Sequence, residues 1–173
     1  PGYYSALAHR GFFPVEDLKT LRHTGSYLQG HPDMKHIPGV DMSSGSLGQG
    51  ISAAVGMAIS AKLSNDDYRV YTLLGDGEIQ EGQVWEASML AGFRKLDNLV
   101  VIVDNNNLQI DGRIDEVNSP YPIDKKFEAF NFHVINIDGH DFDQIAAAFK
   151  EARETKGMPT AIIAKTIKGK GVS

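Results

Sequence analysis

The pattern of apolar and polar positions divides the chain into alternating helical and strand-like segments. Between residues 47 and 63, apolar residues recur at helical spacing and small residues fill the rest of that face, which predicts a helix that packs closely against a neighbour. Further helices are predicted over roughly 82–95 and 141–155. Short β-rich apolar runs predict strands at 69–74, 99–103, 132–137 and 160–166.

The N-terminal part of the chain carries one predicted helix and one long loop. Pro14 suits the first turn of a helix and Glu16 and Asp17 favour its positive end, so a helix is predicted from Pro14 to about Leu28. Residues 30–46 (GHPDMKHIPGVDMSSGS) are dense in glycine, proline and serine, which indicates a loop.

The alternation of apolar strands with helices indicates the fold class. It implies a mainly parallel sheet covered by helices on both faces, an α/β fold with three layers, α/β/α. No repeat, low-complexity segment or interdomain linker is visible, so residues 1–173 are expected to form a single domain. The chain starts without a methionine and stops in a Gly/Lys-rich run, so this domain is expected to be incomplete at both ends.

Composition excludes several classes of function. The 173 residues, 42% hydrophobic and 23% charged, suit one globular domain with a real core. No apolar run approaches the ~20 residues of a membrane-spanning helix, so no membrane association is expected. The net charge of −5 disfavours nucleic acid as a partner. The absence of cysteine excludes thiolate metal sites and cysteine nucleophiles, and it agrees with a cytoplasmic location.

Residues 74–112 carry the candidate chemistry. The sequence GDG at 75–77 follows a predicted strand, at the end where open α/β sheets bind ligands. Glycines let backbone N–H groups approach an anion, and a carboxylate such as Asp76 belongs beside a phosphate when a divalent cation bridges the two. The next predicted strand ends in DNNN at 104–107, and pairing of neighbouring parallel strands would bring both ends together.

These residues suit magnesium, which prefers hard oxygen ligands and keeps several positions for phosphate and water. The Asp76 carboxylate, the Asn106 side-chain oxygen and a backbone carbonyl near Leu108 could supply the protein ligands. Alone, a GDG sequence is usually a turn, and an asparagine run is usually a loop whose side chains bond their own backbone. The combination at this spacing favours a metal–diphosphate site.

The same segment resembles the thiamine diphosphate motif, which opens with GDG and closes with an asparagine. Within that superfamily, EGQVWEA, LDNL and LQIDG are similar to transketolase, and so is the loop GHPDMKHIPGVDMSSGSLGQG, although Ser46 replaces a more common proline. The similarity is strongest to the N-terminal subunit of a split transketolase. It implies the thiamine diphosphate-binding fold, with thiamine diphosphate and magnesium as cofactors; calcium or manganese could replace the magnesium.

The resemblance implies roles for residues near the diphosphate. Asp76 and Asn106 match the metal ligands of the family, and Leu108 matches the position whose main-chain carbonyl completes the set. Asp76, Asn106 and Leu108 thereby also count among the cofactor-binding positions. Three neighbouring residues match further cofactor-binding positions: Gly75, Gly77 and Glu78.

Four other residues match functional positions of the family. Gly45 and Leu47 match positions near the rings of the cofactor. His31 matches a catalytic histidine that touches the substrate; the alternative is a histidine that caps a turn. Glu81 matches a glutamate at the subunit interface that links paired active sites, and equally fits a solvated charge at a helix N-terminus.

The resemblance also implies a reaction and partners. Transketolases transfer a two-carbon ketol unit from a ketose phosphate to an aldose phosphate, so sugar phosphates are the expected substrates. The glutamate that activates the cofactor lies on a pyrimidine-binding domain, which implies a C-terminal subunit or domain as partner in a homodimer or heterotetramer. Histidines that the family carries before the position of Pro1 and beyond Ser173 have no counterpart. Two alternatives are a related enzyme acting on a sulfosugar or branched ketose, and a non-catalytic cofactor-binding module.

Overall fold

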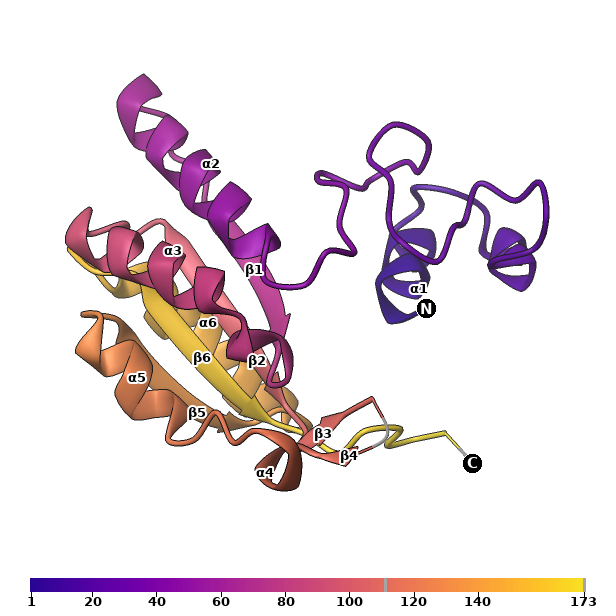
Figure 1. The fold of residues 1–173 in the computed structure, drawn as a ribbon. Helices are drawn as coiled ribbons and strands as arrows, with labels where there is room; N and C mark the ends of the chain where they lie inside the picture. The colour runs from indigo at the N-terminus through magenta and orange to yellow at the C-terminus, as the bar shows by residue number, and fades with distance from the viewer. Residues whose placement is uncertain (111, 173) are drawn as a thin grey trace. The chain divides into compact units, whose positions relative to one another are not determined.

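The computed structural model describes residues 1–110 and 112–172; Asp111, in the LQIDG motif, and Ser173 lie outside the described residues. The chain forms two compact units, Pro1–Leu47 and Gly48–Ser173. Figure 1 shows the first unit in indigo to violet and the second in purple to yellow. The organisation of residues 1–173 as a single domain stays a prediction.

The first unit is built on helix α1 (Gly2–His9) and the 3-10 helix η1 (Val15–Thr20). The hydroxyl of Tyr4 donates a 2.7 Å hydrogen bond to the carbonyl of Gln29, which joins α1 to the loop that follows η1. The buried side chains of this unit form a small core of their own: Tyr4, Leu7, Ala8, Phe13, Leu28, Ile37 and Val40.

The helix predicted from Pro14 to about Leu28 is wrong in type and length. Pro14 precedes only η1, and Leu21 leaves the helical region with φ −47° and ψ 121°. Arg22 and Gly25 then adopt positive φ angles of 64° and 82°, which a right-handed helix does not accommodate. The long loop predicted over 30–46 is confirmed, since no helix or strand occurs there.

The second unit contains a four-stranded parallel sheet in the order β1-β2-β6-β5 and a separate antiparallel pair, β3-β4. Its strands are β1 (Val70–Gly75), β2 (Leu99–Asn105), β3 (Leu108–Gln109), β4 (Gly112–Arg113), β5 (His133–Asp138) and β6 (Thr160–Lys165). Its helices are α2 (Gly50–Ser64), the 3-10 turn η2 (Glu78–Gln80), α3 (Gly82–Phe93), α4 (Ile114–Val117), α5 (Ile123–Ala129) and α6 (Phe142–Glu154).

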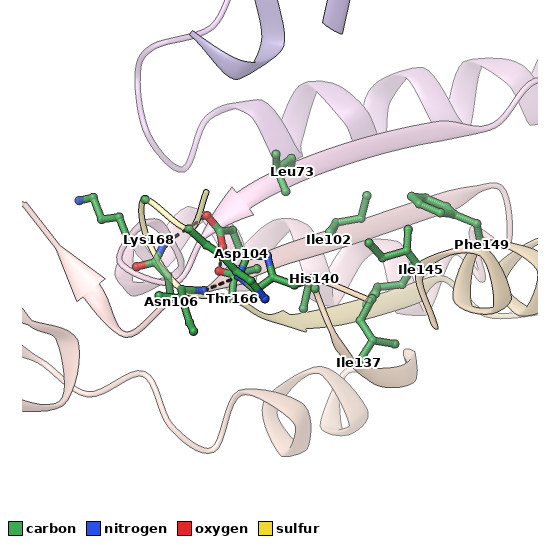
Figure 2. Close-up of a pocket in the computed structure, with 16 residues that line it drawn as sticks. Leu73, Ile102, Asp104, Asn106, Ile137, His140, Ile145, Phe149, Thr166 and Lys168 are labelled. Carbon is green, nitrogen blue, oxygen red and sulfur yellow. Dashed lines mark hydrogen bonds between the residues drawn. The ribbon is translucent and has the colours of Figure 1, made fainter. Parts of the chain in front are cut away.

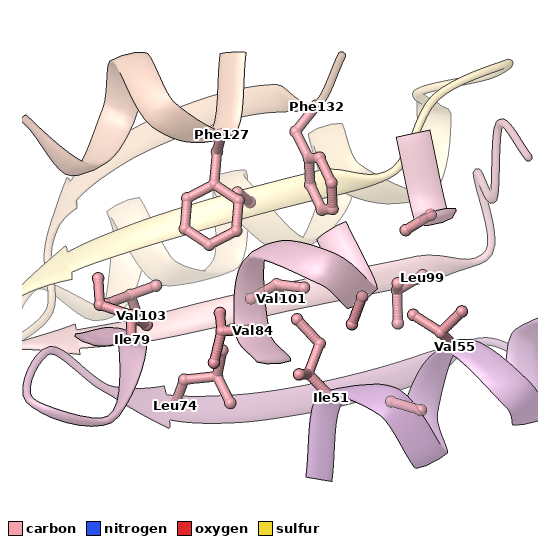
Figure 3. Close-up of a cluster of buried hydrophobic side chains, with 14 of the residues drawn as sticks. Ile51, Val55, Leu74, Ile79, Val84, Leu99, Val101, Val103, Phe127 and Phe132 are labelled. Atoms are coloured by element: carbon pink, nitrogen blue, oxygen red, sulfur yellow. The ribbon is translucent and has the colours of Figure 1, made fainter. Parts of the chain in front are cut away.

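Helices cover both faces of this sheet, which confirms the α/β/α prediction. Side chains of α2, α3 and α5 form a core with one face (Figure 3), where Val101 and Val103 of β2 point. Helix α6 packs on the opposite face against Val100 and Ile162. Successive residues of β2 therefore enter different cores, which is why the strand reads as a continuous apolar run.

A side-chain cap marks the start of α6, and a glycine allows α3 to make one close contact. Asp141 caps α6, because its Oδ1 accepts from the N–H groups of Asp143 and Gln144 at 2.9 and 3.1 Å. Gly92 in α3 lies against the turn after α5, where a Cβ would meet the carbonyl oxygen of Phe130 at 1.8 Å. Among the described residues, no helix combines the length and apolarity needed to cross a membrane.

Candidate functional site

The carboxyl ends of β1 and β2 lie side by side, as the sequence predicts. The strands pair in parallel, with Gly75 opposite Asp104. The N–H of Asp76 continues the ladder and donates to the carbonyl of Asp104 at 3.2 Å. The GDG turn and the asparagine run thus meet at one edge of the sheet, the one formed by the carboxyl ends of its strands.

Asp76 is a buried carboxylate at this edge, with 1% of its surface exposed. Its Oδ2 accepts a 2.6 Å hydrogen bond from the backbone N–H of Asn107. Burial raises the pKa of Asp76, and the negative charge of Asp104 acts in the same direction, while N–H groups including that of Asn107 oppose the rise. A carboxylate in such surroundings is one that a bound cation would stabilise.

Asn106 lies beside Asp76 with both ends of its amide engaged. Its Oδ1 accepts from the N–H of Leu108 at 2.9 Å, and its Nδ2 donates to Asp104 Oδ2 at 3.2 Å. An amide oxygen has two lone pairs, so Oδ1 can still bind a cation. Leu108, 40% exposed, follows directly and places its main chain in the same turn.

Asn107 adds an oxygen without a protein partner. The residue adopts a positive φ of 60°, and its Oδ1 is buried with no hydrogen-bond partner among the described residues. Buried polar atoms are normally satisfied, so an orphaned oxygen on the residue whose N–H bonds Asp76 fits a site that a bound group or water completes.

The donor set at this edge is rich in oxygen and poor in charge. Within residues 1–110 and 112–172, no group of three or more His, Cys, Asp or Glu side chains is placed to hold a metal ion. The predicted ligands do not need such a group, because one carboxylate, one amide oxygen and one carbonyl leave positions for diphosphate and water. The residues present therefore fit magnesium.

Glu78 supports the GDG turn with both carboxylate oxygens. Oε1 accepts from the N–H of Gly48 at 2.9 Å, and Oε2 accepts from the N–H of Gly75 at 3.0 Å. Gly77 leaves little room above the turn, since a Cβ there would approach Cβ of Gln109 to 3.1 Å. Contact of Gly75, Gly77 and Glu78 with a cofactor stays a prediction.

Glu81 is exposed and precedes α3 as its N-cap residue, without a side-chain capping hydrogen bond. Its Cβ lies close to Gly48, where an added Cβ would approach it to 2.7 Å. The position suits a charge at the positive end of a helix. A role at a subunit interface stays a prediction.

The predicted site residues of the first unit include a histidine packed on a glycine. His31 is exposed, and a Cβ on Gly45 would lie 2.5 Å from its Nδ1, so only a glycine allows this approach. Gly45 also has a φ of 138°, which side chains rarely tolerate. Leu47 is 65% exposed. The structure thus brings His31 and Gly45 together, while their roles and that of Leu47 stay predictions.

Three residues near Asn106 were not predicted as site residues from the sequence: Asp104, Tyr121 and Thr166. Thr166 donates from Oγ1 to Oδ1 of Asp104, and Tyr121 donates from its hydroxyl to Oδ1 of Asn105 at 2.7 Å. Burial raises the pKa of Tyr121, and the charge of Asp76 adds to the rise. The position of Asp104 at a strand end was a signal that could have been used. Thr166 and Tyr121 carried no such signal, because their proximity to the site depends on the order of the strands and on the path of a loop.

A groove of about 510 Å³ runs from this polar cluster along the sheet face that carries α6 (Figure 2). Asp104, Asn106, Thr166 and His140 line one end, and Leu73, Ile102, Ile137, Ile145 and Phe149 are among the apolar residues of the other.

Comparison with known proteins agrees with this geometry. The family described as "Transketolase, thiamine diphosphate binding domain" matches residues 3–173. The chain is 49% identical over 173 residues to the 6-deoxy-6-sulfo-D-fructose transketolase subunit SqwG of Clostridium sp. (strain MSTE9), with all of the chain and 63% of that subunit covered. It is 46% identical over 177 residues to transketolase of Mus musculus, covering 27% of that protein.

Solved structures show the same fold. A transketolase from Pichia stipitis in complex with sedoheptulose 7-phosphate superposes with a TM-score of 0.89 at 35% identity, covering 95% of this chain and 26% of that one. The chain thus spans about three fifths of the matched subunit and about a quarter of the single-chain enzymes. By its match over nearly the whole sequence, the chain belongs to the family of transketolase thiamine diphosphate-binding domains.

Proposed function

We propose that this chain holds the diphosphate of thiamine diphosphate through a magnesium ion bound by Asp76, Asn106 and Leu108. The Asp76 carboxylate, the Asn106 side-chain oxygen and the Leu108 main-chain carbonyl would be the protein ligands. The observation that carries the proposal is the pairing of β1 with β2, which sets the buried Asp76 beside the asparagine run. Calcium or manganese would take the same position, because both accept hard oxygen ligands.

The other residues of this edge would shape the turn around the diphosphate. Gly77 lets the backbone approach the anion, because it carries no Cβ. Glu78 accepts hydrogen bonds from the N–H groups of Gly75 and Gly48, so it would hold the turn in its conformation. Gly75 and Glu78 therefore contribute to cofactor binding through the conformation of the GDG turn.

We place this chain in a transferase of the transketolase type, which moves a two-carbon ketol unit from a ketose phosphate to an aldose phosphate. The bound cofactor supplies the carbanion for this chemistry. His31 would donate a hydrogen bond to a substrate oxygen that gains negative charge. Gly45 and Leu47 would contact the cofactor rings, and Glu81 would link paired sites at a subunit interface.

The chain would act with a pyrimidine-binding partner, either a C-terminal subunit or another domain. Its share of the matched relatives supports this, since one relative is named as a subunit and is longer than the region matched. A homodimer or a heterotetramer in the cytoplasm would result, inactive until the pyrimidine-binding part is present.

A second candidate substrate is a sulfonated ketose. The relative that is 49% identical carries 6-deoxy-6-sulfo-D-fructose in its name, whereas the single-chain transketolase of Mus musculus is 46% identical. A site that binds the diphosphate of the cofactor serves both substrates equally. Turnover of each ketose by the reconstituted enzyme distinguishes them.

Calorimetry with thiamine diphosphate, with and without magnesium, tests the cofactor proposal. Binding is expected only with magnesium, and Asp76→Ala or Asn106→Ala should abolish it while the fold is retained. Asp67→Asn, which removes an exposed carboxylate from the same unit, is the matched control and should bind as the parent does. Absence of binding in either condition, even with a C-terminal partner added, would leave a non-catalytic module without cofactor.

A further inference from the structure

Asp104 lies at the junction between the proposed metal ligands and the centre of the sheet. In the strand register, Asp104 of β2 pairs with Gly75 of β1 on one side and with Ala164 of β6 on the other. Its carbonyl accepts from the N–H of Asp76 at 3.2 Å. The backbone that carries the carboxylate is therefore fixed by two neighbouring strands.

The Asp104 carboxylate uses both of its oxygens for side-chain hydrogen bonds (Figure 2). Oδ1 accepts from the hydroxyl of Thr166, and Oδ2 accepts from Nδ2 of Asn106 at 3.2 Å. Thr166 comes from the segment after β6, so residues of two strand ends converge on one carboxylate.

The segment that carries Thr166 is itself held. The next residue, Ile167, donates its N–H to Nε2 of His140 at 2.8 Å. The N–H of Gly139 donates to the carbonyl of Lys165 at 2.8 Å. The loop after β5 thus fixes both neighbours of Thr166, and the threonine hydroxyl has a defined position from which to reach Asp104.

The partners of Asn106 select one orientation of its amide. A carboxylate can only accept hydrogen bonds, so Asp104 requires the NH₂ end, and the backbone N–H of Leu108 can only donate, so it requires the oxygen. Both partners favour the same orientation. Reversal would place oxygen against carboxylate and NH₂ against N–H.

From this arrangement we propose that Asp104 is a positioning residue, held by Thr166, which keeps Oδ1 of Asn106 turned towards the cation. The inference rests on the proposed function, because it assumes that Asn106 is a metal ligand. Only the amide oxygen can bind magnesium, so a reversed amide would present hydrogens to the ion. Mutation of a side chain that hydrogen-bonds a metal ligand commonly lowers the metal affinity by about 10- to 100-fold.

Removal of the acceptor tests the role. Asp104→Leu keeps a side chain of similar length but accepts no hydrogen bond. The magnesium concentration that half-saturates thiamine diphosphate binding, measured by calorimetry, is expected to rise about 10- to 100-fold. Asp67→Leu, the same substitution at an exposed carboxylate of this unit, is the matched control and should leave this concentration unchanged.

Asp104→Leu also removes a negative charge, which by itself would weaken cation binding. Repeating the substitution in an Asn106→Asp variant separates this charge effect from the orientation of the amide. In Asn106→Asp, the ligand is a carboxylate with two equivalent oxygens, which needs no orienting partner. Adding Asp104→Leu there should raise the half-saturating magnesium concentration only about fivefold or less, the size of a simple charge effect. An equal rise in both backgrounds would show that Asp104 does not orient the amide.

Thr166 offers an independent test that keeps the charge of Asp104. Thr166→Val should raise the half-saturating magnesium concentration several-fold, and Thr166→Ser should restore the parent value. This pair decides the matter if Asp104→Leu fails to unfold cooperatively. A parent chain that does not bind cofactor, even with a C-terminal partner added, overturns the proposed function. A parent that binds, with unchanged magnesium requirement in Asp104→Leu and Thr166→Val, overturns this inference alone.

Discussion

Two carboxylates of the second unit have pKa values shifted in opposite directions. For Asp76, burial raises the pKa, and the hydrogen bonds from backbone N–H groups do not cancel the rise. For Asp97, burial also acts upwards, but the N–H of Gly157 and the ammonium of Lys62 outweigh it and lower the pKa. Asp97 is therefore satisfied by the protein itself, whereas the charged form of Asp76 would be stabilised by the cation proposed above.

The lowered pKa of Asp97 makes part of the stability dependent on pH. A carboxylate with a folded-state pKa below its unfolded value stabilises the fold above the unfolded value, near ~3.9, and this contribution is lost as the pH falls through the folded-state pKa. Asp97→Asn should reduce the free energy of unfolding by about 1 kcal/mol at pH 7 and by clearly less near pH ~3.

Urea denaturation of Asp97→Asn and the parent at both pH values measures this contribution. The side chain of Asp97 is 22% exposed and bonds Lys62 at 2.6 Å and the N–H of Gly157 at 2.9 Å. Equal destabilisation at the two pH values would mean that geometry, and not charge, accounts for the effect.

His31 should matter for turnover more than for cofactor affinity. In a complex reconstituted with a C-terminal partner, His31→Ala is expected to lower kcat/KM by about 10²-fold, because a donor to a developing negative charge acts mainly in the transition state. The half-saturating thiamine diphosphate concentration should change little. A loss confined to cofactor affinity would instead assign His31 to cofactor binding.

At the scale of helices and strands, the longer elements were predicted correctly from the sequence. The runs predicted at 69–74, 99–103, 132–137 and 160–166 correspond to β1, β2, β5 and β6, because buried parallel strands are continuous apolar runs bounded by breakers. The helices α2, α3 and α6 were also predicted. The elements missed are short ones, such as α1, α4, α5 and β3-β4, whose few residues carry no sustained period.

The proximity of the candidate ligands was predictable where they lie within one local segment of the sequence. Asp76 and Asn106 follow consecutive strands, so their proximity follows from pairing of β1 with β2. Thr166 reaches the same place because β6 lies next to β2, and no local pattern indicates that order. The positive φ angle of Arg22 that helps end η1 was likewise invisible, since arginine has no special preference for that conformation.

The contact of α3 with the turn after α5 gives a prediction about stability. In Gly92→Ala, the new Cβ would meet a backbone carbonyl at 1.8 Å, so a helix or a turn must move. We expect destabilisation of about 1–3 kcal/mol or more, measured by urea denaturation. Gly56→Ala in α2 is the matched control, because its Cβ would meet nothing within 4 Å. That change should be neutral or stabilising by about 0.5–1 kcal/mol. Similar losses in both variants would contradict the contact.

For the whole molecule, the central expectation is that activity needs a second polypeptide or domain. The chain covers 63% of the matched subunit and 27% of a single-chain transketolase. Two-carbon transfer from a ketose phosphate should be undetectable with this chain alone and appear on mixing with a pyrimidine-binding partner. A coupled assay on each component and on the mixture, with sedimentation to identify the homodimer or heterotetramer, measures both points. Full turnover by the chain alone would refute the need for a partner.

The pairing of β1 with β2 also has a thermodynamic consequence. Each proposed ligand turn continues a strand that is already hydrogen-bonded in the sheet, with Gly75 of β1 facing Asp104 of β2, and β2 is also paired with β6 on its other side. Folding has therefore removed most of the conformational freedom of both turns before any ligand arrives. A cofactor that meets such a preorganised site forfeits little chain entropy on binding. Amide hydrogen exchange at these strand ends should consequently be slow in the free chain and change little when the cofactor binds.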